Sequence, residues 1–234
     1  MFPLRDDIPA KVFPVVNIGL IGANFFWFFY TLGQGGLADQ FLTTYGFVPA
    51  RFLAYSSLSP APERILPLFS SMFLHGGLLH LVTNMWMLWI FGDNVEDAMG
   101  HGRYLAFYLL CGLGSVAAQT WAAPGSNLPM VGASGAISGV LGAYFLTYPR
   151  ARILTLVPLL FFLYLVELPA FYFLGIWFLL QFLQGWAHLF NGESASLGGV
   201  AWWAHVGGFG AGVLLVRMFR KGSRRGRPRR RLRL

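Results

Sequence analysis

The sequence has little charge and almost no cysteine. Charged residues make up 11% of its 234 residues and hydrophobic residues 56%, whereas a soluble domain carries about 25% charged residues. Lipid is therefore the natural environment for much of its apolar surface. The single cysteine, Cys111, excludes an intrachain disulfide and a metal site built on paired cysteines. We expect no cleavable signal peptide, because Asp6 and Asp7 precede the first apolar run and no small-residue cleavage site closes it.

The apolar runs predict an all-α membrane protein, a bundle of six transmembrane helices. A helix needs about 20 apolar residues to cross the hydrocarbon core. The connection 33–77 is unusually apolar for a loop, so short helices lying in the membrane surface are expected there. The stretch 153–186 is too long for one span and short for two, and we interpret 153–166 as interfacial. The predicted spans are 12–32, 78–91, 104–121, 133–148, 168–186 and 200–219, with helix continuing from the second span through Glu96 towards Gly100.

The basic residues favour this count and place both termini in the cytoplasm. Six spans put fifteen of the seventeen Lys and Arg on the inner side, leaving Arg51 and Arg64 outside. A seventh span in 153–186 would move the ten basic residues from Arg217 to Arg233 outside, against the positive-inside rule. We expect one six-span domain, 1–220, in the cell inner membrane as a multi-pass protein. The basic cytoplasmic tail, 221–234, would attract anionic lipid, and nucleic-acid binding is the less favoured alternative.

Polar groups inside a span are costly and call for an explanation, and four polar residues of three predicted spans stand out. The second span carries His80 and Asn84, the fourth opens with Ser134, and the sixth carries His205. These three spans run in the same direction, from outside to inside. The four residues therefore share one depth, near the outer face but below it.

The chemistry of these residues predicts a nucleophilic site. Serine is a poor nucleophile until a base takes its proton, and His205 is the natural base for Ser134. The Ser134 N–H at a helix start faces outward, where the helix dipole favours a developing oxyanion. His80 and Asn84 are spaced i, i+4 and share one helix face, so both could donate hydrogen bonds to that oxyanion.

Small residues on two spans predict close helix packing. Gly208 and Gly212 form a GxxxG pattern, whose ordinary meaning is a tight helix contact. Such a contact would bring the sixth span against the fourth and His205 against Ser134. The glycines of the fourth span that would take part are Gly135, Gly139 and Gly142.

Each polar residue also has a purely structural interpretation. Ser138, one turn deeper than Ser134, is best explained as back-bonding to its own helix, and a lone membrane histidine could pair with a carbonyl or line a proton path. His75 and His80 are five residues apart and no HExxH motif occurs, so we expect no metal site. An aspartyl protease would need two membrane aspartates, and only Asp93 lies near a span.

Taken together, these residues resemble the rhomboid intramembrane serine proteases, of the six-span bacterial type. The resemblance runs from about residue 13 to residue 219. Each motif alone is weak, but their order on the second, fourth and sixth spans is specific. The matching motifs are His80-x-x-x-Asn84, Gly132-Ala133-Ser134-Gly135, Ala204-His205-x-x-Gly208-x-x-x-Gly212 and, after the second span, Gly92-x-x-x-Glu96-x-x-x-Gly100.

The resemblance implies a serine endopeptidase that cleaves single-span membrane proteins near the outer membrane face. Ser134 would be the nucleophile and His205 the general base and acid, without a third acidic residue. His80, Asn84 and the Ser134 N–H would form the oxyanion hole. No cofactor is implied. Substrates would arrive laterally, past the fifth span and the loop 187–199.

Two positions depart from the family pattern. Ser138 stands where some members have an aromatic residue that stacks on the histidine, so His205 must be held otherwise, with Trp202 or Trp203 as candidates. The first loop lacks a clear Trp-Arg pair, and Arg51 is its nearest analogue.

Two other classes of function stay open. A catalytically silent relative would bind transmembrane helices without cutting them, although such relatives usually lack the serine or the histidine. A small-molecule transporter or channel would usually show an internal repeat and charge near mid-depth, and the sequence shows neither.

Overall fold

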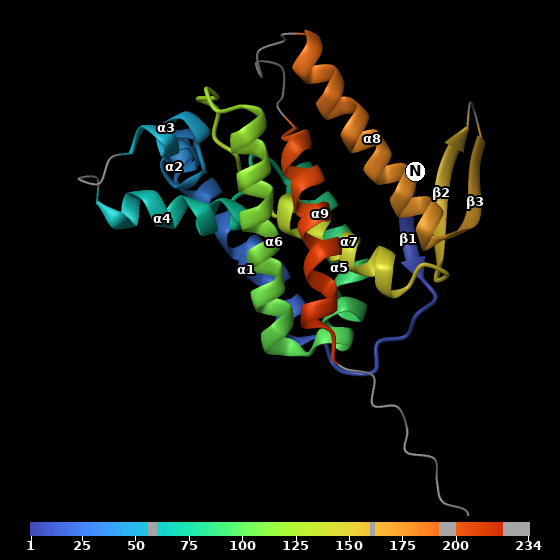
Figure 1. Cartoon of the computed structure of the whole chain (residues 1–234). Coiled ribbons are helices and arrows are strands. Elements are labelled where there is room, and N and C mark those ends of the chain that lie inside the picture. Colours follow the sequence, from blue (N-terminus) through green and yellow to red (C-terminus); the bar gives the residue numbers. More distant parts are fainter. Residues whose placement is uncertain (56–59, 160–161, 192–199, 222–234) are drawn as a thin grey trace, which may run out of the picture.

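The computed structural model describes residues 1–55, 60–159, 162–191 and 200–221, without the side chains of 188, 190 and 191. Most of this part is helical (Figure 1). The long helices are α1 (Val15–Gly33), α5 (Leu78–Met99), α6 (His101–Ala122), α7 (Ser134–Thr147), α8 (Ala170–Asn191) and α9 (Trp202–Phe219). They correspond in order to the six predicted spans. The predicted continuation of the second span towards Gly100 is confirmed, since α5 ends at Met99.

Length and composition identify fewer membrane-crossing helices than six. Three described helices are long and apolar enough to cross a membrane: α1, α6 and the part of α8 from Ala170 to Ala187. A fourth span results if Ala61–Phe73 and Leu78–Met99, which meet at an angle of 79°, count as one broken span. Helix α7 is shorter, at 14 residues. The chain is thus a mostly helical membrane protein.

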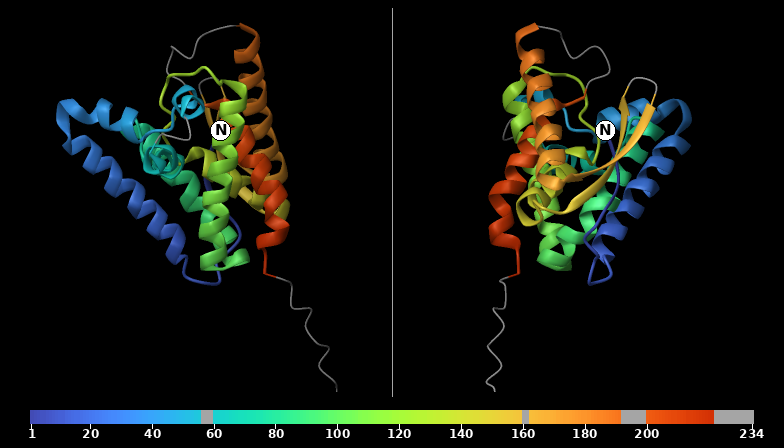
Figure 2. Two further views of the ribbon diagram at one scale, coloured as in Figure 1. Left: turned by 60° about the vertical axis from the view of Figure 1, so that its left-hand side comes forward. Right: turned by 90° about the vertical axis from the view of Figure 1, so that its right-hand side faces the viewer.

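The first connection folds into short helices, as predicted. They are η1 (Gly35–Leu37), α2 (Ala38–Tyr45), α3 (Pro49–Ala54), α4 (Ala61–Ser70) and η2 (Ser71–Phe73). Arg51 stabilises this segment, because its guanidinium donates hydrogen bonds to the carbonyls of Thr43 and Gly46, each at 2.7 Å. Figure 2 shows α1 leaning away from the rest of the bundle towards these helices.

The prediction of an all-α fold is wrong, because three strands form an antiparallel sheet in the order β1-β2-β3. The strands are β1 (Phe2–Asp6), β2 (Arg152–Leu159) and β3 (Phe162–Pro169). Ile153 and Thr155 are fully buried at alternate positions of β2, the period of two expected of a strand. The stretch interpreted as interfacial is therefore a hairpin. Apolar runs did not reveal it, because the alternation is short and β1 pairs with β2 from the other end of the chain.

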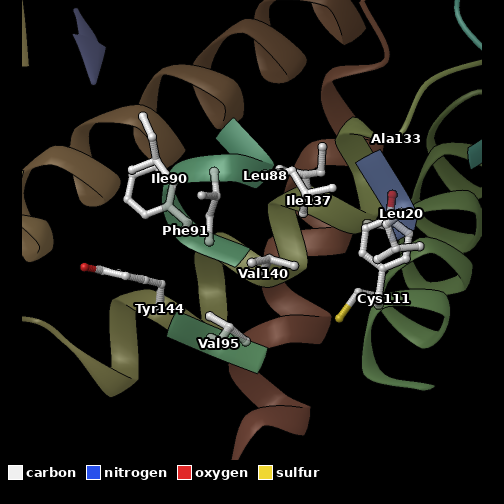
Figure 3. Close-up of a cluster of buried hydrophobic side chains, with 14 of the residues drawn as sticks. Leu20, Leu88, Ile90, Phe91, Val95, Cys111, Ala133, Ile137, Val140 and Tyr144 are labelled. Atoms are coloured by element: carbon white, nitrogen blue, oxygen red, sulfur yellow. The ribbon is translucent and has the colours of Figure 1, made fainter. Parts of the chain in front are cut away.

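The core surrounds α7. All residues of α7 from Gly135 to Tyr144 are buried, which fits a helix that is apolar on every side. Figure 3 shows side chains of α5, such as Phe91 and Val95, meeting Val140 and Tyr144 of α7. By contrast, α8 exposes large apolar side chains along its length, as lipid contact requires; these include Phe171, Leu179, Leu180 and Leu183.

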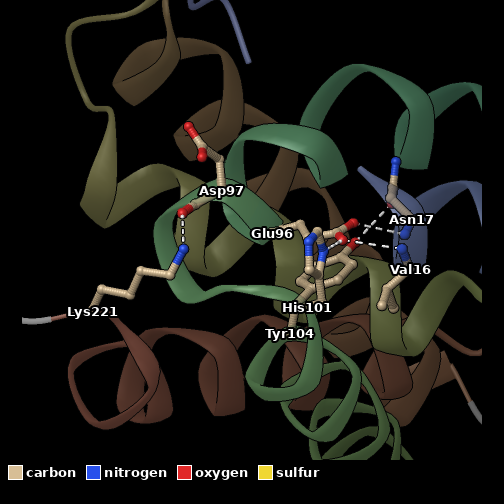
Figure 4. A network of polar contacts seen from close by, with 7 residues as sticks. All are labelled: Val16, Asn17, Glu96, Asp97, His101, Tyr104 and Lys221. Atoms are coloured by element: carbon tan, nitrogen blue, oxygen red, sulfur yellow. Dashed lines mark hydrogen bonds and ion pairs between the residues drawn. The ribbon is translucent and has the colours of Figure 1, made fainter. Parts of the chain in front are cut away.

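A buried carboxylate joins α1 to α5 at the end of the bundle away from Ser134 (Figure 4). Glu96 accepts hydrogen bonds from the N–H groups of Val16 (3.0 Å) and Asn17 (2.8 Å) and pairs with His101. It therefore satisfies the open amides at the start of α1. Tyr104 donates to the Asn17 side chain at 2.8 Å. A side chain at Gly92 would collide with Asn17, which explains the glycine there.

Candidate active site

Ser134 is the first residue of α7, and the turn before it requires glycine. Gly132 has a φ of +132°, and its N–H donates to the Ser71 carbonyl at 2.9 Å. A Cβ at Gly132 would lie 2.8 Å from the His80 ring. The turn therefore brings the chain close against His80 and directs it into α7. The N–H of Ser134 lies in the first turn, where amides have no partner within the helix.

Backbone contact between α7 and α9 fixes the two helices that carry Ser134 and His205. A Cβ on Gly208 would collide with the carbonyl oxygen of Gly135, and one on Gly212 with that of Gly139. Gly142 lies against the backbone of Phe209 in the same way. The structure thus brings together the glycines that the sequence paired. At these three glycines no side chain separates the two backbones, so the spacing between the helices leaves little freedom.

Ser134 and His205 share a hydrogen bond across this interface. The Ser134 Oγ lies 2.8 Å from the His205 Nε2, although the residues are 71 positions apart in sequence. The other ring nitrogen, Nδ1, lies 2.6 Å from the Oε1 of Gln181 on α8. Because an amide oxygen only accepts, this bond forms in the tautomer that carries its proton on Nδ1. The Nε2 lone pair then faces the Ser134 hydroxyl, the arrangement that a general base needs.

Aromatic rings of α8 and α9 also contact His205. The centroid of the Trp177 ring lies 6.0 Å from that of the imidazole, with an angle of 34° between the ring planes. The Trp202 ring is perpendicular to the imidazole, with centroids 6.3 Å apart. Trp203, the other candidate from the sequence, points elsewhere, since its Nε1 donates to the Gly185 carbonyl at 3.1 Å. Gln181 and Trp177 were missed by the sequence analysis. The rule that singled out polar residues in other spans would have found Gln181 had it been applied to the fifth.

His80 lies beside the segment that leads into Ser134, and Asn84 follows one turn further along α5. The His80 ring packs edge-on against His75, with centroids 5.1 Å apart. The Asn84 amide donates to the His80 carbonyl at 2.9 Å, and Asn84 is buried. The bond to the His80 carbonyl uses one of the two N–H groups of the Asn84 amide. Asn84 has no recorded bond to Ser134 within the described residues.

Ser138 behaves as expected of a structural serine. Its hydroxyl donates to the carbonyl of Ser134, one turn earlier, at 2.7 Å. That bond confirms back-bonding to its own helix. Among the described residues, no three His, Cys, Asp or Glu side chains are grouped so as to hold a metal ion.

Comparison with known proteins assigns the family. The family model of the Rhomboid domain matches residues 62–222, which is more than half of the chain and includes every residue of this site. The chain belongs to the rhomboid family. This rhomboid chain is 38% identical over 122 residues to presenilin-associated rhomboid-like protein A, mitochondrial, of Danio rerio, covering 49% of this chain and 32% of that protein.

Two further relatives support the assignment. Rhomboid protein 1, mitochondrial, of Saccharomyces cerevisiae is 29% identical over 169 residues, covering 70% of this chain and 45% of that protein. Rhomboid protease GluP of Bacillus subtilis is 44% identical over 77 residues, covering 32% of this chain and 14% of that protein. The matched stretch is thus less than half of each relative's own length.

Proposed function

We propose that this rhomboid protein is an intramembrane serine endopeptidase. Ser134 is the nucleophile, and His205 is the general base and acid. The observation that supports this most directly is the 2.8 Å hydrogen bond from Ser134 Oγ to His205 Nε2. Family membership adds to it, since GluP is by name a rhomboid protease. A hydrogen-bonded serine and histidine whose helices are held by backbone contact is what acyl transfer requires.

The reaction follows from the positions of these atoms. The Ser134 Oγ attacks the scissile carbonyl carbon while its proton passes to His205 Nε2. The C–N bond of the tetrahedral intermediate then breaks, and His205 returns the proton to the leaving amine. A water molecule attacks the resulting acyl ester, giving one proton to His205. Collapse of the second intermediate releases the new carboxyl terminus and returns that proton to Ser134.

The oxyanion is the group that most needs stabilisation in each tetrahedral step. We assign this role to the Ser134 N–H, the His80 ring and the Asn84 amide. The first-turn position of the Ser134 N–H, the packing of His80 against Gly132 and the second N–H of Asn84 support the assignment. The catalytic chemistry needs no cofactor.

We further propose that α1, α5, α6, α7, α8 and α9 are six spans with both termini in the cytoplasm. Helix α7 is short for a span, and its burial on every side supports a place at the centre of the bundle. The charge distribution supports the orientation. The proposed location is the cell inner membrane, with single-span membrane proteins as substrates cut near its outer face. Anionic lipid would bind the tail 221–234, which beyond Lys221 lies outside the described residues, as does 192–199 of the proposed access loop.

Cleavage by the full chain in liposomes tests this function. A single-span reporter with small residues near the outer face should be cut by the wild type, and not by Ser134→Ala or His205→Ala. Ser138→Ala is the matched control and should keep cutting, because its hydroxyl only bonds its own helix. A folded wild type that binds the reporter but does not cut it would instead identify a catalytically silent helix-binding protein.

A further inference from the structure

We infer that Gln181 is a positioning residue for His205, holding the imidazole in the tautomer and orientation that Ser134 needs. The inference deepens the proposed protease function and rests on it. Gln181 contacts His205 Nδ1 and not the Nε2 that faces Ser134, so its proposed role acts through His205. It takes the place that an acidic residue fills in a serine protease triad.

The His205 ring is positioned by hydrogen bonds to both of its nitrogens. Gln181 Oε1 lies 2.6 Å from His205 Nδ1, and Ser134 Oγ lies 2.8 Å from His205 Nε2, so the imidazole is hydrogen-bonded on both sides. A neutral imidazole has two tautomers, and only the one protonated on Nδ1 can accept the serine proton on Nε2. The Gln181 oxygen selects that tautomer. Its bond also limits rotation of the ring about the Cβ–Cγ bond.

A polar side chain on α8 is costly unless it has a partner. The 18 residues from Ala170 to Ala187 have a mean hydropathy of 1.3 and qualify as a membrane span. An amide in such a helix is unfavourable unless it is hydrogen-bonded. Gln181 is half-buried and meets His205, whereas Gln184, one turn further, is exposed. The bond to His205 therefore explains the amide at position 181.

Attack by Ser134 leaves His205 as an imidazolium, and the carbonyl dipole of Gln181 points its negative end at Nδ1. A carboxylate would stabilise that cation more strongly, but it would be a permanent charge at membrane depth, which is costly. A neutral amide gives a part of the stabilisation without that charge. This matches the absence of an acidic side chain from the described bonds of His205.

Helix α8 carries Gln181 and is docked onto α9 by side chains. Phe178 stacks on Phe209 with centroids 4.6 Å apart, and Trp203 donates to the Gly185 carbonyl at 3.1 Å. These contacts place α8 so that Gln181 lies beside His205. The alignment of His205 is therefore coupled to the docking of α8.

Two substitutions in the full-length protein test the inference through the rate of fluorophosphonate labelling and through reporter cleavage. Gln181→Met keeps the volume and suits lipid but removes the acceptor. We expect labelling and kcat to fall about 10- to 100-fold, with KM within about twofold, because a misoriented group costs on that order. Gln184→Ala is the matched control on the same helix, and we expect labelling within about twofold of wild type.

The pH profile of Gln181→Glu separates positioning from a merely structural role. The glutamate keeps the acceptor oxygen but adds a charge, so His205 holds its second proton to higher pH. The half-maximal pH of labelling should rise by about one unit or more, with the rate above it recovering to within about fivefold of wild type. The groups facing His205 are the Ser134 hydroxyl on α7, the residue-181 side chain on α8 and the titratable His80 on α5. His80 is unchanged in every variant, so the shift reports position 181.

The outcomes separate this inference from the proposed function. A 10- to 100-fold slower labelling of Gln181→Met, together with a raised half-maximal pH of labelling in Gln181→Glu, supports the positioning role of Gln181. Wild-type labelling in Gln181→Met, or an unshifted midpoint in Gln181→Glu, overturns it while leaving the protease intact. A misfolded methionine variant leaves the decision to the glutamate profile. A wild type that neither labels nor cuts overturns the proposed function itself.

Discussion

The two faces of α9 are built in different ways. Towards α7, Gly208 and Gly212 bring backbone against backbone. Towards α8, the contacts are made by side chains: Trp203 to the Gly185 carbonyl, His205 to Gln181, and Phe209 to Phe178. The first face holds the two backbones in direct contact, whereas the second is held by side-chain contacts. The distance between Ser134 and His205 is therefore set by backbone, and the orientation of His205 by side chains.

The lipid environment explains why α9 packs tightly on α7 and more loosely on α8. Apolar surface gains little by leaving lipid for another helix, so small residues that allow close approach drive association. The α7–α9 contact meets that condition. Helix α8 instead exposes large side chains such as Leu179 and Leu183, which are as stable against lipid as against protein. The nucleophile and its base thus lie on the rigid pair.

Disrupting the backbone contact between α9 and α7 should have the largest effect on stability and labelling. In Gly208→Val, the new side chain would collide with the Gly135 carbonyl. We expect a loss of about 1–3 kcal/mol in stability, as overpacking in a tight core gives, and no detectable labelling of Ser134. Thermal unfolding in detergent and fluorophosphonate labelling measure the two effects.

Gly210→Ala is the matched control, because a Cβ at Gly210 meets nothing within 4 Å. It should unfold and label as the wild type does. If Gly208→Val did the same, the backbone contact would not be what holds His205 to Ser134.

Removing an oxyanion donor should have the next largest effect. Asn84→Ala is expected to lower kcat about 100- to 1000-fold, as loss of one such donor does, with KM and the fold nearly unchanged. Reporter cleavage measures it. Thr83→Ala is the control, since the Thr83 hydroxyl bonds carbonyls of its own helix. An unchanged rate in Asn84→Ala would remove this residue from the oxyanion hole.

Damage at the end of the bundle away from Ser134 should affect stability and spare the site. Glu96→Ala removes the acceptor of the Val16 and Asn17 amides, and leaving buried donors unpaired costs about 1–3 kcal/mol. We expect a lower unfolding temperature but wild-type labelling at low temperature. Asp97→Ala, at a less buried neighbour, should change stability less. If Glu96→Ala also lost labelling at low temperature, the Glu96 end of the bundle and the Ser134 end would not be independent.

Weakening the side-chain contacts between α9 and α8 should have the smallest effect on labelling. Trp203→Phe keeps an aromatic ring and removes the hydrogen bond to the Gly185 carbonyl. One such bond is worth about 1 kcal/mol, so labelling should fall about fivefold or less. Trp121→Phe, at the exposed ring that contacts Trp203, should leave labelling unchanged. A loss as large as that of Gly208→Val would contradict the division between the two faces.

The sequence predicted the residues whose signal is local and missed those that depend on tertiary contact. Apolar runs gave the long helices, and glycine spacing gave the α7–α9 contact. The sheet was missed because β1 pairs with β2 across most of the chain: Asp6 stands opposite Ile153. Trp202 and Trp203 were offered as supports for His205; Trp202 lies against the imidazole and Trp203 does not. That Gln181 and Trp177 of α8 also face His205 depends on how α8 packs on α9, which the sequence does not show.

The most direct test of the account is the identity of the residue that a fluorophosphonate modifies. Purified wild type, Ser134→Ala and His205→Ala would be labelled side by side and mapped by mass spectrometry. The account predicts an adduct on Ser134 alone in the wild type, none in Ser134→Ala and almost none in His205→Ala. An adduct that persists in Ser134→Ala, full labelling in His205→Ala, or no adduct in a folded wild type would contradict it.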